Sequence, residues 1–227
     1  MPLENIFTIS TDEEFNAMAL KTFQVQYHEN LVYQEFCRHL GKNVSNVKTL
    51  EDIPFLPIEF FKSKKVICGS FTPQITFTSS GTTGSEVSKH HVKNLELYEN
   101  SYLTAFRHFY GDIEDYCVLA LLPSYLEREG SSLIYMANDL IHKSKHPDSG
   151  FYLDDLDRLQ KTLLELDAQN TKTLLLGVSF ALLDMAEKFP LKLKNTVVME
   201  TGGMKGRKKE LIREELHQLL KNGFGVE

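Results

Sequence analysis

Residues 77–89, FTSSGTTGSEVSK, hold the densest group of side chains that could do chemistry. Four hydroxyls and two glycines occupy the six residues Ser79, Ser80, Gly81, Thr82, Thr83 and Gly84, directly after the strand-like run 74–78. Hydroxyls donate hydrogen bonds to anions, and glycines let backbone N–H groups turn toward a ligand and approach it closely. This composition favours a phosphate-binding loop, and a surface loop rich in small polar residues is the alternative.

The spacing in this loop differs from that of the common nucleotide-binding motifs. A Walker loop has its lysine directly after the second glycine, whereas Lys89 stands five residues after Gly84, and no Gly-x-Gly-x-x-Gly is present. No serine lies in a Gly-x-Ser-x-Gly context, which removes the simplest hydrolase interpretation. Adjacent His90 and His91 would point to different faces and lack a third ligand, so polar surface is favoured over a metal site.

Composition and charge limit the class of protein. The 227 residues, 42% of them hydrophobic, can bury one large core or two modest ones. A formal charge of -6 argues against binding nucleic acid or an anionic membrane by electrostatics alone. The start lacks a secretory signal, no apolar run approaches a membrane span, and three cysteines without metal-ligand spacing favour a reducing compartment. We therefore expect a cytoplasmic protein with no nucleic-acid partner and no membrane span.

The pattern of hydrophobic residues divides the chain into two regions. Residues 1–65 are expected to be helical, with a capping box at Thr11–Glu14 and a second helix over 31–40 that Gly41 ends. Residues 66–227 are expected to form an α/β region whose largely parallel sheet is flanked by helices. The expected strands are 66–69, 74–78, 116–122, 172–176 and 196–200, and the expected helices are 93–109, 131–142, 154–168, 178–188 and 207–221.

Position in the sheet supports the interpretation of the loop. In open α/β sheets, ligands bind beyond the carboxyl ends of the strands. The hydroxyl-glycine loop follows the run 74–78, so we expect it at such an end.

The loop, with Thr78 before it and Lys89 after it, resembles the phosphate-binding loop of the adenylate-forming enzymes, which join a carboxylic acid to AMP. Three further motifs are similar to those of the acyl-protein synthetases of bacterial luminescence and their phenylacetate-CoA ligase relatives. They are PFLP at 54–57 with Phe61-Lys62, LPSYLER at 122–128 and ETGGMKGR at 200–207. The resemblance covers about residues 50–210. Four motifs in the right order are more specific than the loop alone.

This resemblance implies particular roles for particular residues. The β- and γ-phosphates of ATP would be held by Ser79, Ser80, Gly81, Thr82, Thr83, Gly84 and Lys89, and the adenine would lie against Gly202, Gly203 and Met204. A strand-to-helix turn is the alternative for the paired glycines. Ser124, Tyr125 and Ser179 would line an acyl pocket or merely cap and turn the chain, and a helix N-cap is favoured for Ser179.

The implied reaction activates a carboxylic acid, with a fatty acid as first choice, to an acyl-adenylate by means of ATP and Mg2+. The acyl group then passes to a thiol, which could belong to a protein cysteine, an acyl carrier protein or coenzyme A. The sequence does not choose among these acceptors. A catalytically incomplete nucleotide-binding or regulatory module is the alternative, and an acyltransferase that uses no nucleotide is a further one.

The sequence also departs from the family pattern. An aromatic-Gly-x-Thr-Glu motif, a carboxyl-terminal domain with a catalytic lysine, and a late acyl-accepting cysteine are expected from the resemblance and do not occur in these residues. We therefore expect an amino-terminal fragment that is inactive alone, and the catalytic residues stay unknown. The usual Gly-x-Pro-Lys continuation of the loop is replaced by residues 84–89, which leaves the role of Lys89 open.

Overall fold

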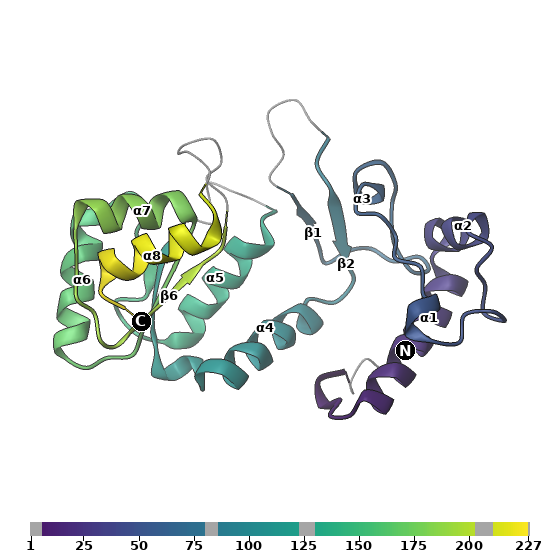
Figure 1. Ribbon diagram of the computed structural model, residues 1–227, viewed down its shortest axis with the longest axis horizontal. Helices are drawn as coiled ribbons and strands as arrows, with labels where there is room; N and C mark the ends of the chain where they lie inside the picture. The colour runs from purple at the N-terminus through teal and green to yellow at the C-terminus, as the bar shows by residue number, and fades with distance from the viewer. Residues whose placement is uncertain (1–5, 80–85, 123–129, 203–210, 227) are drawn as a thin grey trace. The chain divides into compact units, whose positions relative to one another are not determined.

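The computed structural model describes residues 6–79, 86–122, 130–202 and 211–226 (Figure 1). The chain divides into two compact units. Unit 1 comprises residues 1–104 and 130–132, and unit 2 comprises residues 105–129 and 133–227. The boundary that the sequence predicts at residue 65 lies inside unit 1, and it stays a prediction.

The amino-terminal part of unit 1 is helical, as the sequence predicts. Helix α1 begins at a capping box in which Glu14 N–H donates to Thr11 Oγ1 over 3.2 Å and the Glu14 carboxylate accepts from Thr11 N–H. The small hydrophobic core of this amino-terminal part is formed by Phe23, Tyr33, Cys37 and Val47. The elements are η1 (Ile6–Thr8), α1 (Asp12–Glu29), α2 (Leu31–His39), η2 (Leu50–Asp52) and α3 (Phe60–Ser63).

A β-hairpin follows in unit 1. Strand β1 (Ile75–Thr78) pairs antiparallel with β2 (Lys89–Val92), which places Thr78 opposite Lys89 and Thr76 opposite His91. Our assignment of the run 74–78 to the parallel sheet was therefore wrong. Parallel neighbours need a crossover of about a dozen residues or more, and residues 79–88 are too few for one. The hydroxyl-glycine loop consequently joins two hairpin strands and does not follow a strand of the parallel sheet.

The predicted strand 66–69 is also wrong. Gly69 has a φ of +66°, a left-handed conformation that interrupts an extended strand. Its N–H donates to the carbonyl oxygen of Glu29 over 2.8 Å and so joins this segment to the end of α1. The segment is therefore a loop held to the amino-terminal helices.

Unit 2 confirms the predicted α/β fold with a parallel sheet flanked by helices (Figure 1). The strand order is β4-β3-β5-β6, and every neighbouring pair is parallel. Strands β3 and β5 are buried along their whole length, which explains their continuous apolar sequences. The strands are β3 (Cys117–Leu121), β4 (Gly150–Phe151), β5 (Thr173–Gly177) and β6 (Thr196–Glu200).

The helices agree with the sequence in number and approximate position over this region. Helix α8 begins and ends later than the predicted range 207–221, and residues 203–210 lie outside the described part of the chain. No helix in the described ranges combines the length and apolar character needed to cross a membrane. The helices are α4 (Leu95–Tyr110), which begins in unit 1, η3 (Ile113–Asp115), α5 (Ser132–Ser144), α6 (Leu156–Ala168), α7 (Ser179–Lys188) and α8 (Arg213–Phe224).

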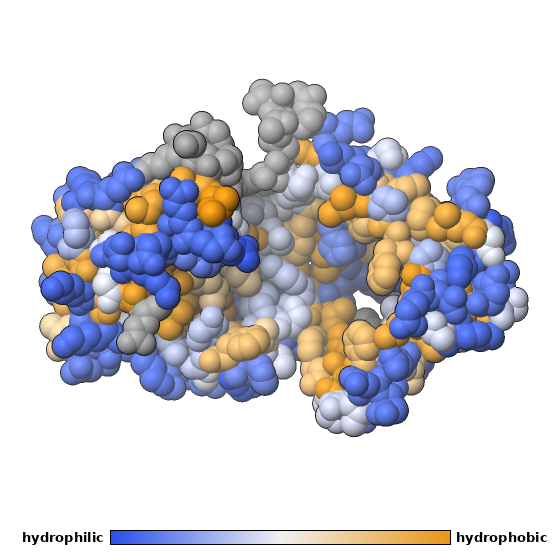
Figure 2. Space-filling model, in the orientation of Figure 1, coloured by the Kyte–Doolittle hydropathy of each residue, from blue (hydrophilic) through white to orange (hydrophobic). Residues whose placement is uncertain are grey.

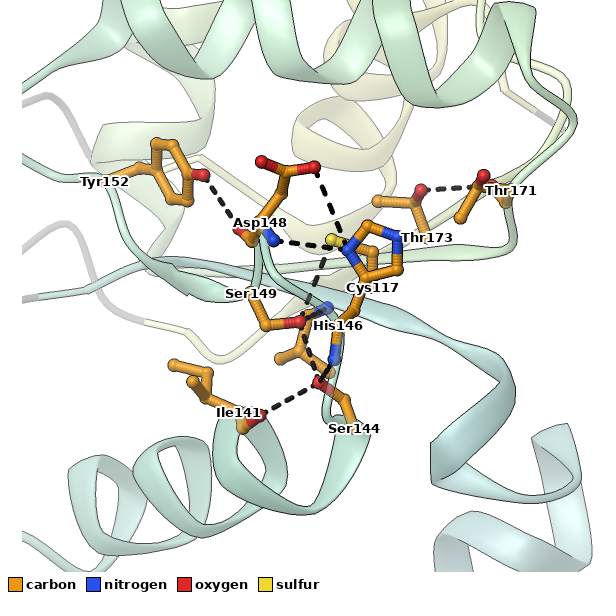
Figure 3. A network of polar contacts seen from close by, with 10 residues as sticks. Cys117, Ile141, Ser144, His146, Asp148, Ser149, Tyr152, Thr171 and Thr173 are labelled. Carbon is orange, nitrogen blue, oxygen red and sulfur yellow. Dashed lines mark hydrogen bonds and ion pairs between the residues drawn. The ribbon is translucent and has the colours of Figure 1, made fainter.

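A buried polar network closes the amino-terminal end of β3 (Figure 3). The hydroxyl of Ser149 accepts a hydrogen bond from Val118 N–H over 2.8 Å, lies 2.7 Å from the Ser144 hydroxyl, and contacts Cys117 Sγ at 3.7 Å. Burial raises the pKa of the Cys117 thiol to about 11. The thiol therefore stays protonated near neutral pH, which agrees with a packing role and not with that of a nucleophile.

Candidate functional site

The stem of the hydroxyl-glycine loop is closed by two serines. Ser79 N–H donates to the Ser88 carbonyl oxygen over 3.1 Å, and Ser88 N–H donates to Ser79 Oγ over 3.0 Å. A hydroxyl that accepts a hydrogen bond can still donate its own hydrogen, so Ser79 can serve both the stem and a ligand. The other predicted loop residues, Ser80, Gly81, Thr82, Thr83 and Gly84, lie outside the described residues.

The hairpin register groups polar side chains on one face, here called the threonine face, formed by Thr76, Thr78, Lys89 and His91. Directly opposed residues of an antiparallel pair share a face, and residues two apart along a strand share it too. The hydrogen bond between Thr76 Oγ1 and His91 Nδ1, 3.0 Å long, agrees with this arrangement. Lys89 therefore begins β2 beside Thr78, at the end of the hairpin from which the loop leaves.

Gly130 contacts the strand that precedes the loop. Thr78 N–H donates to the Gly130 carbonyl oxygen over 2.8 Å. Gly130 has a φ of +80°, and a Cβ at this position would lie 2.9 Å from Thr78 Oγ1. The close approach thus requires glycine. Ser124 and Tyr125, which precede this contact in the sequence, lie outside the described residues.

A second polar group lies in unit 2, where β3, β5 and β6 end side by side. The parallel register aligns Leu121 with Gly177 and Gly177 with Glu200. Thr201 donates to the Gly177 carbonyl oxygen through both its N–H and its hydroxyl, over 3.0 and 3.1 Å. The carboxyl edge of the sheet is therefore tied together at the position where α/β proteins place ligands.

Ser179 belongs to this edge, although not in the role favoured from the sequence. The N-cap of α7 is Val178, whose backbone is extended, and Ser179 is the first helical residue. The predicted N-cap role of Ser179 is therefore wrong, since its hydroxyl turns to the neighbouring strand end. The residue is 1% exposed, and its Oγ donates to the carboxylate of Glu200.

Glu200 is the functional candidate that sequence reasoning missed. Its Oε1 accepts hydrogen bonds from both the Ser179 hydroxyl and Gly202 N–H, while the residue itself is half-buried. The available signal was a carboxylate at the end of an apolar strand, directly before Thr-Gly-Gly. Gly202 lies after the strand end with a φ of +82°, and the other predicted adenine residues, Gly203 and Met204, lie outside the described part of the chain.

Unit 1 also contains an apolar pocket, and Pro54, Phe55 and Leu56 of the PFLP motif form part of its wall. Its volume is about 700 Å3, and aromatic residues such as Phe15 and Phe55 lie on its walls with 54% and 85% of their surface exposed. The polar groups of the pocket satisfy one another, since Asn30 bonds to Gln26 and to Tyr33 N–H. Figure 2 shows apolar residues reaching the surface over the amino-terminal helices. The pocket therefore suits an apolar group and not a charged one.

Potential metal ligands are dispersed. Within the described ranges, no group of three or more histidine, cysteine, aspartate or glutamate residues could hold a metal ion.

The fold and these contacts define an α/β protein with a hydroxyl-rich hairpin loop and a glutamate-centred edge on a parallel sheet. Comparison with known proteins finds 63 residues, 27% of this chain, that are 40% identical to the long-chain-fatty-acid–luciferin-component ligase of Vibrio harveyi. The matched segment covers 16% of that protein. No family model matches the chain, and no solved structure matches it. The chain is therefore similar to a ligase over a limited segment.

Proposed function

We propose that the chain is part of an ATP-dependent ligase that activates a carboxylic acid, in the first place a fatty acid, and passes the acyl group to a thiol. The observation that carries the proposal is the likeness to the Vibrio ligase, whose name specifies a long-chain fatty acid. Two features of the chain support it. These are the hydroxyl-glycine loop with its closed stem and the apolar pocket of unit 1.

In the proposed reaction, a carboxylate oxygen of the acid attacks the α-phosphorus of ATP. The bond from that phosphorus to the β-phosphate bridge oxygen breaks, and pyrophosphate leaves with the electron pair. A thiolate then attacks the acyl carbon of the adenylate and releases AMP. The acceptor thiol is open among a protein cysteine, an acyl carrier protein and coenzyme A.

Residues of the hairpin would position the phosphates. The Ser79 hydroxyl can donate to a phosphate oxygen, and the Lys89 ammonium supplies positive charge at the same end of the hairpin. Mg2+ bound to the phosphates would neutralise part of the charge that develops on pyrophosphate. In phosphoryl and adenylyl transfer, such groups act mainly by positioning and electrostatic stabilisation. The catalytic residues themselves stay unassigned.

The acyl chain is assigned to the apolar pocket of unit 1. Pockets for small molecules have volumes of roughly 300–1,000 Å3 and mostly apolar walls. Its volume of about 700 Å3 falls in this range. Ser124, Tyr125 and Ser179 stay candidates for the lining of an acyl pocket, and Gly202, Gly203 and Met204 stay candidates for the adenine.

The test combines ATP binding with acid-dependent exchange of pyrophosphate into ATP, using a panel of fatty and aryl acids and the 227-residue protein. We expect ATP to bind and Gly81→Ala to abolish binding, because a Cβ would keep phosphate from the loop backbone. The matched control is Gly150→Ala in β4, where a Cβ would meet its nearest neighbour at 3.7 Å, an ordinary contact.

Each other outcome has a distinct meaning. Absence of ATP binding would contradict the proposal. Exchange is expected only from a longer protein that contains this chain, and ATP binding without acid-dependent exchange by that longer protein would favour a nucleotide-binding or regulatory module. Acyl transfer that needs no ATP would indicate an acyltransferase.

A further inference from the structure

Positive charge is concentrated around the hairpin. Residues 60–93 contain five lysines and two histidines but only one carboxylate, that of Glu86, although the whole chain carries a formal charge of -6. All five lysines are exposed, and within the described residues none of them forms an ion pair. They are Lys62, Lys64, Lys65, Lys89 and Lys93. An excess of positive charge over negative charge attracts anions.

Part of this charge lies on the threonine face of the hairpin. Lys89 and His91 share that face with Thr76 and Thr78, and His91 is held by Thr76 Oγ1 at 3.0 Å. Helix α3 packs against the other face of the hairpin, where the ring centroids of Phe61 and His90 are 6.2 Å apart. Lys65 follows α3 by two residues, and its charge is among the causes that lower the pKa of His91. Two segments distant in sequence thus contribute positive charge around the hairpin.

We propose that Lys65, Lys89 and His91 form an anion subsite that binds the terminal phosphates of a polyphosphate on the threonine face. This inference rests on the proposed function, in which the hydroxyl-glycine loop binds the phosphates of ATP. The subsite would add a second set of contacts to those phosphates. It adds Lys65 and His91 as positioning residues, which the loop motif does not contain. It also gives Lys89 a role through its place opposite Thr78.

The protonation of His91 provides a signature of the subsite. The pKa of His91 is held below its ordinary value. Burial is the largest cause, and the positive charges of Lys65, Lys89 and His90 add to it. The groups described around His91 are Thr76 from β1, Lys89 and His90 from β2, and Lys65 after α3. A bound polyanion reverses the sign of this field and favours the imidazolium. Binding should therefore take up a proton and strengthen as pH falls.

The experiment is calorimetric titration of the 227-residue protein with inorganic tripolyphosphate at about pH 6 and pH 8. Buffers of different ionisation enthalpy report the number of protons taken up. We expect Lys89→Gln and Lys65→Gln each to weaken binding about tenfold, which corresponds to about 1.4 kcal/mol. Tripolyphosphate itself titrates in this pH range, so proton uptake is compared between variants. His91→Asn, which keeps a polar group toward Thr76, should take up fewer protons than the unaltered protein and should have a weaker pH dependence.

The matched control is Lys21→Gln in α1, which removes an exposed lysine of the same unit that forms no ion pair among the described residues. It should change affinity less than twofold, and circular dichroism should show that every variant is folded. If the Lys65, Lys89 and His91 variants lose no more tripolyphosphate affinity than the control, the subsite is overturned. If Gly81→Ala loses affinity in that case, the proposed function still stands.

Two further outcomes separate the remaining interpretations. Dependence on Lys65, Lys89 and His91 without any effect of Gly81→Ala would support the anion subsite and count against the phosphate loop. Absence of tripolyphosphate binding to the unaltered protein would overturn both. Displacement of tripolyphosphate by polyaspartate of equal charge, with equal affinity, would overturn the polyphosphate assignment in favour of an acidic protein partner.

Discussion

Replacement of Gly130 by alanine tests the contact between Gly130 and Thr78, the last residue of β1 before the loop. The substitution has two costs. A φ of +80° is unfavourable for a residue with a Cβ, which costs about 1 kcal/mol. The new Cβ would also lie 2.9 Å from Thr78 Oγ1, so the stiff threonine side chain must leave its rotamer at a further cost of about 1 kcal/mol.

The two costs can be separated with variants of unit 1. Gly41 has a φ of +67° with no atom within 4 Å of its would-be Cβ, so Gly41→Ala has the backbone cost alone. We expect Gly130→Ala to lower the free energy of unfolding by about 2 kcal/mol and Gly41→Ala by about 1 kcal/mol. In the Thr78→Ala background the Oγ1 is gone, and Gly130→Ala should then cost about as much as Gly41→Ala.

The assay is urea unfolding followed by circular dichroism and tyrosine fluorescence, because the chain has no tryptophan. ATP affinity is measured on the same variants. If the Gly130 contact positions the loop, Gly130→Ala should weaken ATP binding and Gly41→Ala should not. Equal destabilisation by Gly130→Ala and Gly41→Ala, with or without Thr78, would refute the reasoning.

Two further predictions concern stability. Hydrogen bonds from Lys42 and from backbone N–H groups lower the pKa of Asp52 to about 2. Its contribution to stability is therefore complete above about pH 5 and is lost as pH falls through about 2. Acid titration of Asp52→Asn should lack this part of the transition. Ser179→Ala removes a donor to a carboxylate and should lower the free energy of unfolding of unit 2 by about 1–2 kcal/mol. In a Glu200→Ala background the same change should cost less, and an undiminished cost would contradict the contact.

Elements with local causes could be predicted from the sequence. The capping box formed by Thr11 and Glu14 predicts where α1 begins. The buried strands β3 and β5 can be predicted because their sequences are largely apolar. Strand β2 was missed because its sequence, Lys-His-His-Val, lacks the apolar alternation of a half-buried strand. Strand β4, only two residues long, has no periodicity to detect.

In the candidate site, too, features with a local cause could be predicted from the sequence and features that depend on the fold could not. The residue types of 79–84 indicated a phosphate loop, because hydroxyls and glycines are recognisable without knowledge of the fold. The partners of Glu200 were not predictable, since Ser179 is 21 residues away and meets it only through the register of β5 and β6. The contact between Thr78 and Gly130 likewise depends on a left-handed glycine that no local pattern reveals.

The two polar groups differ in the chemistry that they offer, and this difference constrains the ligand. The threonine face presents hydroxyls, Lys89 and unpaired lysines nearby, so it suits an anion. The sheet edge presents the carboxylate of Glu200, which accepts hydrogen bonds and would repel a phosphate at close range. A ligand group that binds at this edge should therefore carry hydrogen-bond donors. Taken each by itself, the hairpin favours an anion and the sheet edge favours a group that donates hydrogen bonds.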